Sequence, residues 1–353
     1  MRRYIVSTAL LLAAVAPSGS IAQQSPSRVV EVDVPAPSLA GNRVGSETTQ
    51  PALVYLPAGY DDDATRRYPV LYLLHGIFDR PETWTEHFQV PAMLDRLIGR
   101  GALPAVIVVM PSGGNRYGGG YYRDSPVTGR WATHIARDLV GFIDGRFRTR
   151  AAPHARAILG HSMGGFGAIH VPMEFPGVFS VAYAMSPCCL APIEDVGLGN
   201  VAWRSAFGWS ELADYEAALE AREFYPVAVM GVLAAFAPDT TAGPFFVDFP
   251  FELVRGEAVV DEAEWLAFVE RFPVSRVDER RAALTSLRAL AMDYGTGDQF
   301  VHIPAGTLLL SQRLGELRVP HLLDVYAGDH REQLAGRMES FVLPWVGRAL
   351  GAE

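Results

Sequence analysis

One short segment near the middle of the chain combines a nucleophile with the glycines that would expose it. Residues 160–165 read GHSMGG and follow an apolar run, 155–159, that predicts a strand. Small and apolar residues over 165–171 predict a helix after it. A serine on a sharp turn between strand and helix projects its hydroxyl, and the flanking glycines leave room where the two elements crowd. Ser162 is therefore the candidate nucleophile, with an ordinary Gly-rich turn as the alternative.

The same turn would stabilise negative charge. The amide of Met163 and the positive end of the following helix would face the point where an attacked carbonyl oxygen becomes an oxyanion. A second donor is expected in the turn after an early strand, where residues 74–78 read LHGIF. We assign this role to the amide of Ile77, with Phe78 as the alternative. His75 is interpreted as a structural residue that braces the turn.

A serine hydroxyl needs a base to accept its proton and an acid to orient that base. Two histidines lie near the last predicted strand, 322–326. His321 precedes this strand and would lie at the wrong end of a parallel sheet. His330 follows it on a small loop that can reach back to Ser162, so His330 is the candidate base.

The candidate acid follows the predicted strand 290–292. Asp298 stands beyond a turn with two glycines, which can fold its carboxylate toward an imidazole, whereas Asp293 is closer to the strand. We favour Asp298 and expect Asp293 to pin the loop. Asp329, beside the candidate base, is interpreted as a residue that caps or solvates its own loop.

The amino-terminal residues predict export. Two arginines are followed by an apolar stretch over 4–16 and by Ser20-Ile21-Ala22, which suits a signal-peptide cleavage site. We therefore expect a signal peptide over 1–22, a mature chain of 23–353, and a secreted or periplasmic protein. The alternative, a membrane anchor, needs about 20 apolar residues, and no later segment is long and apolar enough to span a bilayer.

Composition excludes several classes of function. The net charge is −9 and the mature chain has no basic run, which argues against nucleic acid as a partner. All 30 basic residues are arginine, so a Schiff-base lysine and a Walker phosphate loop are impossible. No metal-ligand motif is present, and we expect no metal and no cofactor. Cys188 and Cys189 are adjacent; two buried thiols are favoured over a vicinal disulfide.

Short apolar runs alternate with helical patterns, which indicates a mostly parallel sheet with helices on both faces. The predicted strands are 70–74, 105–110, 157–159, 181–185, 290–292 and 322–326, with an antiparallel edge from 29–34 and 52–56. Residues spaced as in a helix over 131–142 would pack one apolar face on the sheet.

The alternation is interrupted between strands 181–185 and 290–292. An insertion over 190–286 is rich in Trp and Phe and is broken by prolines in its middle. Connections that leave the carboxyl ends of parallel strands surround the site, so the insertion is predicted to form a helical lid over the serine. The alternative is a peripheral helical decoration.

These motifs resemble the putative esterase family of α/β-hydrolases, which includes feruloyl and acetylxylan esterases, siderophore esterases, S-formylglutathione hydrolases and mycolyltransferases. The resemblance covers roughly 69–187 and 289–345. It rests on YLLHG at 72–76 with Trp84 downstream, MPSGG at 110–114, DLV at 138–140, GHSMGGFGA at 160–168, GTGD at 295–298 and GDH at 328–330.

The resemblance implies an α/β-hydrolase fold and a triad of Ser162, Asp298 and His330, with oxyanion amides at Met163 and Ile77. The expected function is an exported serine carboxylic-ester hydrolase acting through an acyl-enzyme on a small-molecule or polysaccharide-linked ester. Because compact feruloyl esterases lack the long insertion, their substrate is not carried over. The alternatives are an acyltransferase to a sugar or other alcohol, and a catalytically silent binding protein with the same fold.

Overall fold

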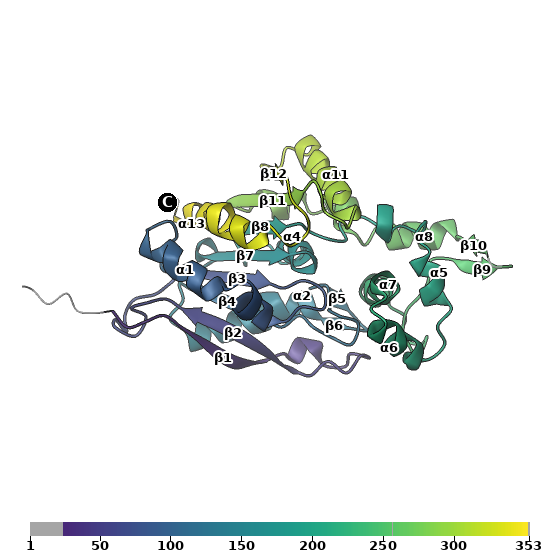
Figure 1. Cartoon of the computed structure of the whole chain (residues 1–353), viewed down its shortest axis with the longest axis horizontal. Coiled ribbons are helices and arrows are strands. Elements are labelled where there is room, and N and C mark those ends of the chain that lie inside the picture. Colours follow the sequence, from purple (N-terminus) through teal and green to yellow (C-terminus); the bar gives the residue numbers. More distant parts are fainter. Residues whose placement is uncertain (1–23, 256, 352–353) are drawn as a thin grey trace, which may run out of the picture.

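The computed structural model describes residues 24–255 and 257–351 of the chain. The expected signal peptide, 1–22, lies outside these residues. An eight-stranded sheet runs through the molecule in the order β1-β2-β4-β3-β7-β8-β11-β12 (Figure 1). Its strands are β1 Arg28–Pro35, β2 Thr49–Leu56, β3 Val70–Leu74, β4 Ile107–Pro111, β7 Arg156–His161, β8 Val181–Met185, β11 Ala289–Gly295 and β12 Leu322–Tyr326.

The sheet confirms the predicted α/β fold with a mostly parallel sheet. The strands from β4 to β12 in the sheet order pair in parallel, while β1 pairs with β2 and β2 with β4 in antiparallel orientation. Every residue of β3, β4, β7 and β8 is buried. Continuous apolar runs form these strands because both of their faces are covered.

Helices cover both faces of the sheet (Figure 1). The helices are α1 Val90–Gly99, α2 Trp131–Thr133, α3 Val140–Arg146, α4 Met163–Glu174, α5 Ala202–Phe207, α6 Leu212–Glu220, α7 Phe224–Phe236, α8 Glu262–Val269, α9 Pro273–Arg276, α10 Arg281–Thr285, α11 His302–Glu316, α12 Leu334–Arg337 and α13 Leu343–Gly351. Wider π-helical turns occupy Thr83–His87, His134–Leu139 and Met338–Val342. Two-stranded ribbons are formed by β5 Asp124–Ser125 with β6 Gly129–Arg130 and by β9 Glu252–Val254 with β10 Glu257–Val259.

The helical pattern predicted over 131–142 is present, but it is not one regular helix. A π-helical turn separates α2 from α3. Trp131, Ile135 and Leu139 are nevertheless fully buried. The wider turn therefore keeps the apolar face of this segment on the core.

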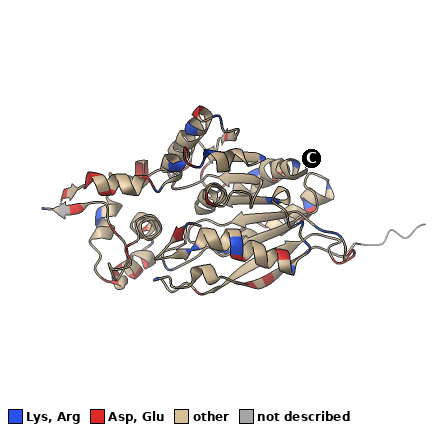
Figure 2. Cartoon of the chain, turned by 180° about the vertical axis from the view of Figure 1, so that it is seen from behind, with Lys and Arg blue, Asp and Glu red and all other residues tan. Residues whose placement is uncertain are grey.

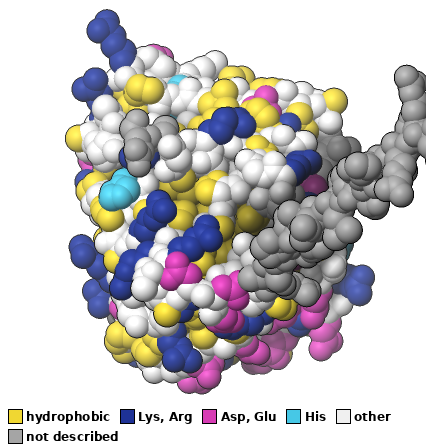
Figure 3. Space-filling view, turned by 90° about the vertical axis from the view of Figure 1, so that its left-hand side faces the viewer, with side chains coloured by type: hydrophobic (Ala, Val, Ile, Leu, Met, Phe, Trp, Pro, Cys, Tyr) yellow, Lys and Arg dark blue, Asp and Glu magenta, His cyan; other side chains and the backbone are white. Residues whose placement is uncertain are grey.

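The segment between β8 and β11 contains α5 to α10 and the β9–β10 ribbon. In Figure 1, α5 to α8 and the β9–β10 ribbon gather at one end of the sheet. The segment starts at the carboxyl end of β8, which is the edge where Ser162 follows the adjacent parallel strand β7. The end of the molecule opposite the insertion carries arginine, acidic and apolar side chains interspersed with one another (Figure 3).

Charged residues of both signs are spread over helices and loops, with few on the central strands (Figure 2). Within 24–255 and 257–351, no helix combines the length and the apolar character needed to cross a bilayer.

Close backbone packing fixes the turn between β7 and α4. Ser162 has φ 57° and ψ −115°, which side-chain-bearing residues rarely adopt. A Cβ added to Gly160 would lie 2.1 Å from the carbonyl oxygen of Gly164, and one added to Gly164 would lie 2.1 Å from that of Leu74. Because these two glycines have no side chains, the backbones of β7, the turn after it and the neighbouring strand β3 can come into direct contact.

We predict that Gly164→Ala lowers the free energy of unfolding by roughly 2–3 kcal/mol, because the added methyl must displace the backbone of β3. Gly141→Ala is the matched control: Gly141 lies in α3 with open space around its Cβ position. The control should be neutral or stabilise by up to about 1 kcal/mol. Urea unfolding of both variants measures the difference, and equal stabilities would contradict the packing described for the turn.

Candidate active site

Ser162 stands at the carboxyl end of β7 and caps α4. Its amide donates a hydrogen bond to the carbonyl of Met185 at 3.0 Å. Its own carbonyl accepts hydrogen bonds from the amides of Phe166 at 3.0 Å and Cys188 at 3.1 Å. Backbone from α4 and from the end of β8 and the loop after it thus fixes the position of the serine.

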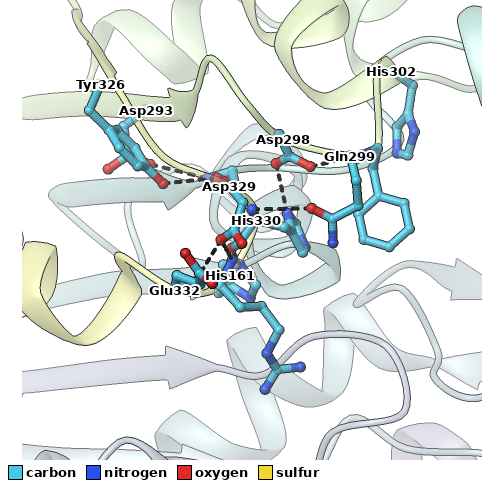
Figure 4. A network of polar contacts seen from close by, with 12 residues as sticks. His161, Asp293, Asp298, Gln299, His302, Tyr326, Asp329, His330 and Glu332 are labelled. Atoms are coloured by element: carbon cyan, nitrogen blue, oxygen red, sulfur yellow. Dashed lines mark hydrogen bonds and ion pairs between the residues drawn. The ribbon is translucent and has the colours of Figure 1, made fainter.

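The structure brings Asp298 and His330 together. His330 Nδ1 donates a hydrogen bond to Asp298 Oδ2 at 2.8 Å, and both residues are buried (Figure 4). The other carboxylate oxygen of Asp298 accepts from the amide of Phe300 at 2.9 Å. Because Nδ1 of His330 is engaged by Asp298, Nε2 is the ring nitrogen that remains available to exchange protons. Ser162 and His330 line the same cavity.

Hydrogen bonds between two loops set the position of this pair. The amide of Thr296 donates to the carbonyl of Tyr326, and the amide of Gly297 donates to that of Gly328, both at 2.8 Å. A Cβ at Gly295 would lie 2.4 Å from the Gly328 carbonyl oxygen. The loop after β11 that carries Asp298 and the loop after β12 that carries His330 therefore pack directly on each other.

Asp293 occupies a different environment from Asp298. Its carboxylate accepts hydrogen bonds from the Tyr183 hydroxyl at 3.0 Å, the Ser186 amide at 3.1 Å and the Arg337 guanidinium at 3.2 Å. Burial raises the pKa of Asp293 to about 6. Figure 4 shows it beside Tyr326, on the far side of Asp329 from the Asp298 carboxylate. Its partners tie β8, β11 and α12 together, which is a structural role.

Two further residues from the sequence analysis have structural partners. Asp329 Oδ1 accepts from the amides of Arg331 and Glu332 at 2.9 and 2.7 Å and so caps its own loop. His321 lies before β12, where Nε2 is 2.8 Å from the Ser311 hydroxyl.

His75 is buried and braces the turn after β3. Its Nε2 accepts from the Gly113 amide at 2.8 Å, while Nδ1 donates to the Gly76 carbonyl at 2.8 Å. This is the structural role expected of it from the sequence.

The turn after β3 lies beside the serine. A Cβ at Gly76 would be 3.5 Å from Ser162 Cβ. The amide of Phe78 is already engaged, because it donates to the Gly118 carbonyl at 3.0 Å. Of the two alternatives for the second oxyanion donor, this leaves the amide of Ile77, whose residue lines the cavity. Met163 opens α4 directly after the serine.

Sequence reasoning missed the role of His161. Its Nε2 donates to the His330 carbonyl at 2.8 Å, and the two rings lie 4.4 Å apart between centroids. Burial holds the pKa of His161 well below its usual value, and the neighbouring His330 adds to this effect. His161 therefore stays neutral and anchors the backbone of the loop after β12. The one feature of the sequence that could have indicated this role is the position of His161 directly before Ser162.

The cavity has a volume of about 180 Å³ and a largely apolar wall. The insertion supplies much of this wall through α7, which contributes Phe224, Tyr225 and Val229, and through Trp203 of α5. Other aromatic residues of the insertion pack on one another instead, as Phe207 does with Phe249 and Phe251.

Cys188 and Cys189 also line the cavity. Both are buried and free, which confirms the prediction of two buried thiols. Between 24–255 and 257–351, no cluster of His, Cys, Asp and Glu has the arrangement of a metal site.

Comparison with known proteins places these features in context. The model of the family described as "Putative esterase" matches residues 44–333. An esterase of Mycobacterium tuberculosis is 36% identical over 138 residues, which cover 38% of this chain and 28% of the relative. An endo-1,4-beta-xylanase/feruloyl esterase of Xylanibacter ruminicola is 33% identical over 141 residues, covering 38% of this chain and 19% of the relative. The chain thus matches less than a third of the length of these curated relatives.

Among solved structures, a ferulic acid esterase superposes with a TM-score of 0.64 at 22% sequence identity. The superposition covers 92% of this chain and 98% of the other. At this identity the likeness establishes the fold, which is that of α/β-hydrolase esterases.

We predict that His161→Gln reduces the loss of stability in acid. Because the pKa of folded His161 lies below its unfolded value of about 6.5, the unfolded chain takes up a proton that the folded protein resists. The free energy of unfolding should therefore fall as the pH drops below 6.5, by up to ~1.4 kcal/mol per pH unit for this residue. Urea unfolding at pH 7 and pH 5 should show a shallower fall in the variant; an unchanged fall would contradict the assignment.

Proposed function

The chain belongs to the putative esterase family, and on that premise we propose that it is a serine carboxylic-ester hydrolase with Ser162, His330 and Asp298 as its triad. The observation that carries the proposal is the 2.8 Å hydrogen bond from His330 to the buried Asp298, on loops that border the cavity of Ser162. Ser162 also has the strained backbone of a nucleophile at a turn between strand and helix.

The first half of the reaction acylates the serine. His330 Nε2 takes the proton of the Ser162 hydroxyl as its oxygen attacks the ester carbonyl. The amides of Met163 and Ile77 donate to the oxyanion, and a donor of this kind is typically worth about 3–4 kcal/mol in the transition state. His330 then protonates the departing alcohol, which leaves an acyl group on Ser162. Asp298 keeps the proton on Nδ1 and stabilises the charged imidazole.

The second half removes the acyl group. Water enters the site of the departed alcohol, gives a proton to His330 and attacks the acyl carbonyl. The same two amides hold the second oxyanion. When it collapses, the proton returns to Ser162 and the carboxylic acid leaves, so no cofactor is consumed.

The cavity supports a compact acyl group as the part of the substrate that is enclosed. Its volume of about 180 Å³ is below the ~300–1,000 Å³ of pockets that enclose drug-sized ligands. Phe224, Tyr225 and Phe300 supply apolar and aromatic walls. In this proposal the insertion acts as a lid over the acyl group, and the alcohol, a small molecule or part of a polysaccharide, extends outside.

Export is also part of the proposal. The basis is the pattern over 1–22, which lies outside the described residues. The proposed site of action is therefore the periplasm or the medium. Detection of a mature form that begins near Gln23 in the exported fraction would test it.

The rate of hydrolysis of p-nitrophenyl acetate, butyrate and octanoate tests the activity. Wild type should hydrolyse the short esters fastest, because the cavity is small. Ser162→Ala should lower turnover by at least ~10⁴-fold, because it removes the nucleophile. Turnover that survives this substitution would contradict the proposal; circular dichroism shows that the variant is folded.

The choice of acid gives a matched pair of variants. We predict that Asp298→Asn lowers kcat by roughly 10³–10⁴-fold, because the amide favours the wrong imidazole tautomer. Asp293→Asn should leave kcat within a few-fold and instead lower the free energy of unfolding by roughly 1–3 kcal/mol, because the single amide oxygen cannot accept all the hydrogen bonds that Tyr183, Ser186 and Arg337 donate to the buried carboxylate. Ester hydrolysis and urea unfolding of both variants check the ranking, and the reverse order would make Asp293 the acid.

A further inference from the structure

A second hollow adjoins the cavity of Ser162, and we call it the outer hollow. It has a volume of about 210 Å³, and its wall is made of Phe78, Leu219, Arg222, Glu223, Phe224 and Val227. Phe224 also lines the cavity, and Phe78 directly follows Ile77, which lines the cavity too. The two spaces therefore lie next to each other. The acyl group proposed for the cavity does not occupy the outer hollow, which leaves it for another part of the substrate.

The wall of the outer hollow is mostly apolar. Phe78, in the turn after β3, is 42% exposed, and Leu219, near the end of α6, is 44% exposed. Large apolar side chains at this exposure gain free energy when a ligand covers them. The two charged residues of the wall, Arg222 and Glu223, have opposite signs, so the outer hollow has no net charge that would attract an ionic group. The wall thus favours an uncharged, apolar ligand.

Phe78 is held in a backbone conformation that bulky residues rarely adopt. Its φ is 62°, in the left-handed region. Its amide donates a hydrogen bond to the Gly118 carbonyl at 3.0 Å, and its ring lies so close to Gly118 that a Cβ there would overlap it. Glycine or asparagine would adopt this conformation at a lower cost. An exposed aromatic ring that is fixed in place at such a cost beside a candidate active site indicates a contact with ligand.

A row of aromatic rings connects the base to the outer hollow. The ring centroids of His330 and Phe300 lie 4.9 Å apart, those of Phe300 and Phe224 lie 4.9 Å apart, and those of Phe224 and Phe78 lie 6.0 Å apart. In the proposed mechanism His330 protonates the departing alcohol, so the alcohol oxygen must lie within hydrogen-bond distance of Nε2. An alcohol that begins at this nitrogen and follows the row of rings reaches the outer hollow.

We propose that the outer hollow is the subsite for the alcohol part of the substrate, and that it selects alcohols that carry a flat apolar group, such as a phenyl ring, on a short linker. The proposal rests on the proposed esterase function and assigns the leaving group of that reaction. Phe78 and Leu219 contact the apolar group and act as specificity-determining residues, while the compact acyl group stays in the cavity.

Esters with one acyl group and different alcohols test the subsite. The substrates are 2-phenylethyl, 3-phenylpropyl and 4-phenylbutyl acetate, compared with propyl acetate; methylene groups separate each ring from the hydroxyl, so the alcohols have similar acidity. The readout is the ratio of kcat/KM for the best phenylalkyl ester to kcat/KM for propyl acetate. We expect a ratio of at least ~10 in wild type, because the ring is removed from water onto the apolar wall.

Two substitutions in the wall should lower this ratio. We expect Leu219→Gln and Phe78→Asn each to reduce it by at least ~3-fold, because each replaces apolar contact area with a polar group. Asparagine tolerates the positive φ at this position. A general disturbance of the turn that carries Ile77 would slow both kinds of ester alike and leave the ratio unchanged.

Leu266→Gln is the matched control. Leu266 is another leucine of the insertion, 52% exposed on α8, and it lies outside the walls of both the cavity and the outer hollow. This variant should keep the wild-type ratio. A wild-type ratio near 1, or a ratio that Leu219→Gln and Phe78→Asn both leave unchanged, would overturn the proposal.

A binding measurement distinguishes failure of the subsite from failure of the esterase function. Binding of 3-phenyl-1-propanol to Ser162→Ala, followed by ligand-observed NMR, requires no ester turnover. Adding Leu219→Gln should weaken this binding by at least ~3-fold, whereas adding Leu266→Gln should leave it unchanged. Equal affinity in all three proteins would overturn the subsite even where the esters are hydrolysed, and the expected ranking would support it even where they are not.

Discussion

The backbone contact between β3, β7 and the start of α4 is the constraint on which the site depends. Gly160 and Gly164 allow this contact, and side chains at either position would meet carbonyl oxygens at 2.1 Å. The contact holds Ser162 in a strained conformation that costs of order 1–3 kcal/mol. Fully buried parallel strands on both sides of the turn offset this cost. This single backbone contact therefore fixes the relative positions of the serine, the turn that carries Ile77 and the first amide of α4.

The proposed base His330 and the proposed acid Asp298 are positioned by contacts between their loops. Their loops follow β11 and β12, the last two strands of the sheet, and each loop hydrogen-bonds the other. His161 connects this pair of loops to β7 through the carbonyl of His330. Arg337 connects the same two strands, because it donates hydrogen bonds to Asp293 of β11 and to Asp324 of β12. The geometry of the site is thus set by contacts among strand ends, with the insertion supplying the opposite wall.

The sequence alone predicts those strands and loops whose residue types form a recognisable local pattern. The strands β3, β8 and β12 begin and end as predicted. The buried strands β3 and β8 form uninterrupted apolar runs bounded by polar turns. The sequence predicts a pairing of Asp298 with His330 because each follows a strand on a glycine-containing loop, and the structure brings them within hydrogen-bonding distance.

The wall formed by the insertion could not be predicted in the same way. Asp195 and His302 are 107 positions apart, so their contact depends on how the insertion folds over the sheet. Trp203 packs on Phe251 and Phe268 and also lines the cavity, whereas Phe207, one turn further along α5, packs on Phe249 and Phe251 and is absent from the cavity wall. Composition alone does not distinguish these two environments, because aromatic side chains occur both in hydrophobic cores and in the walls of pockets.

The central claim is that Ser162 is a nucleophile activated by His330 within this cavity. The most direct measurement is the reaction of the folded protein with a small alkyl fluorophosphonate, followed by mass spectrometry of the modified peptide. The account predicts a single adduct on Ser162 that forms at least ~10²-fold more slowly in His330→Ala. An adduct on another residue, or an equal rate in His330→Ala, would contradict it.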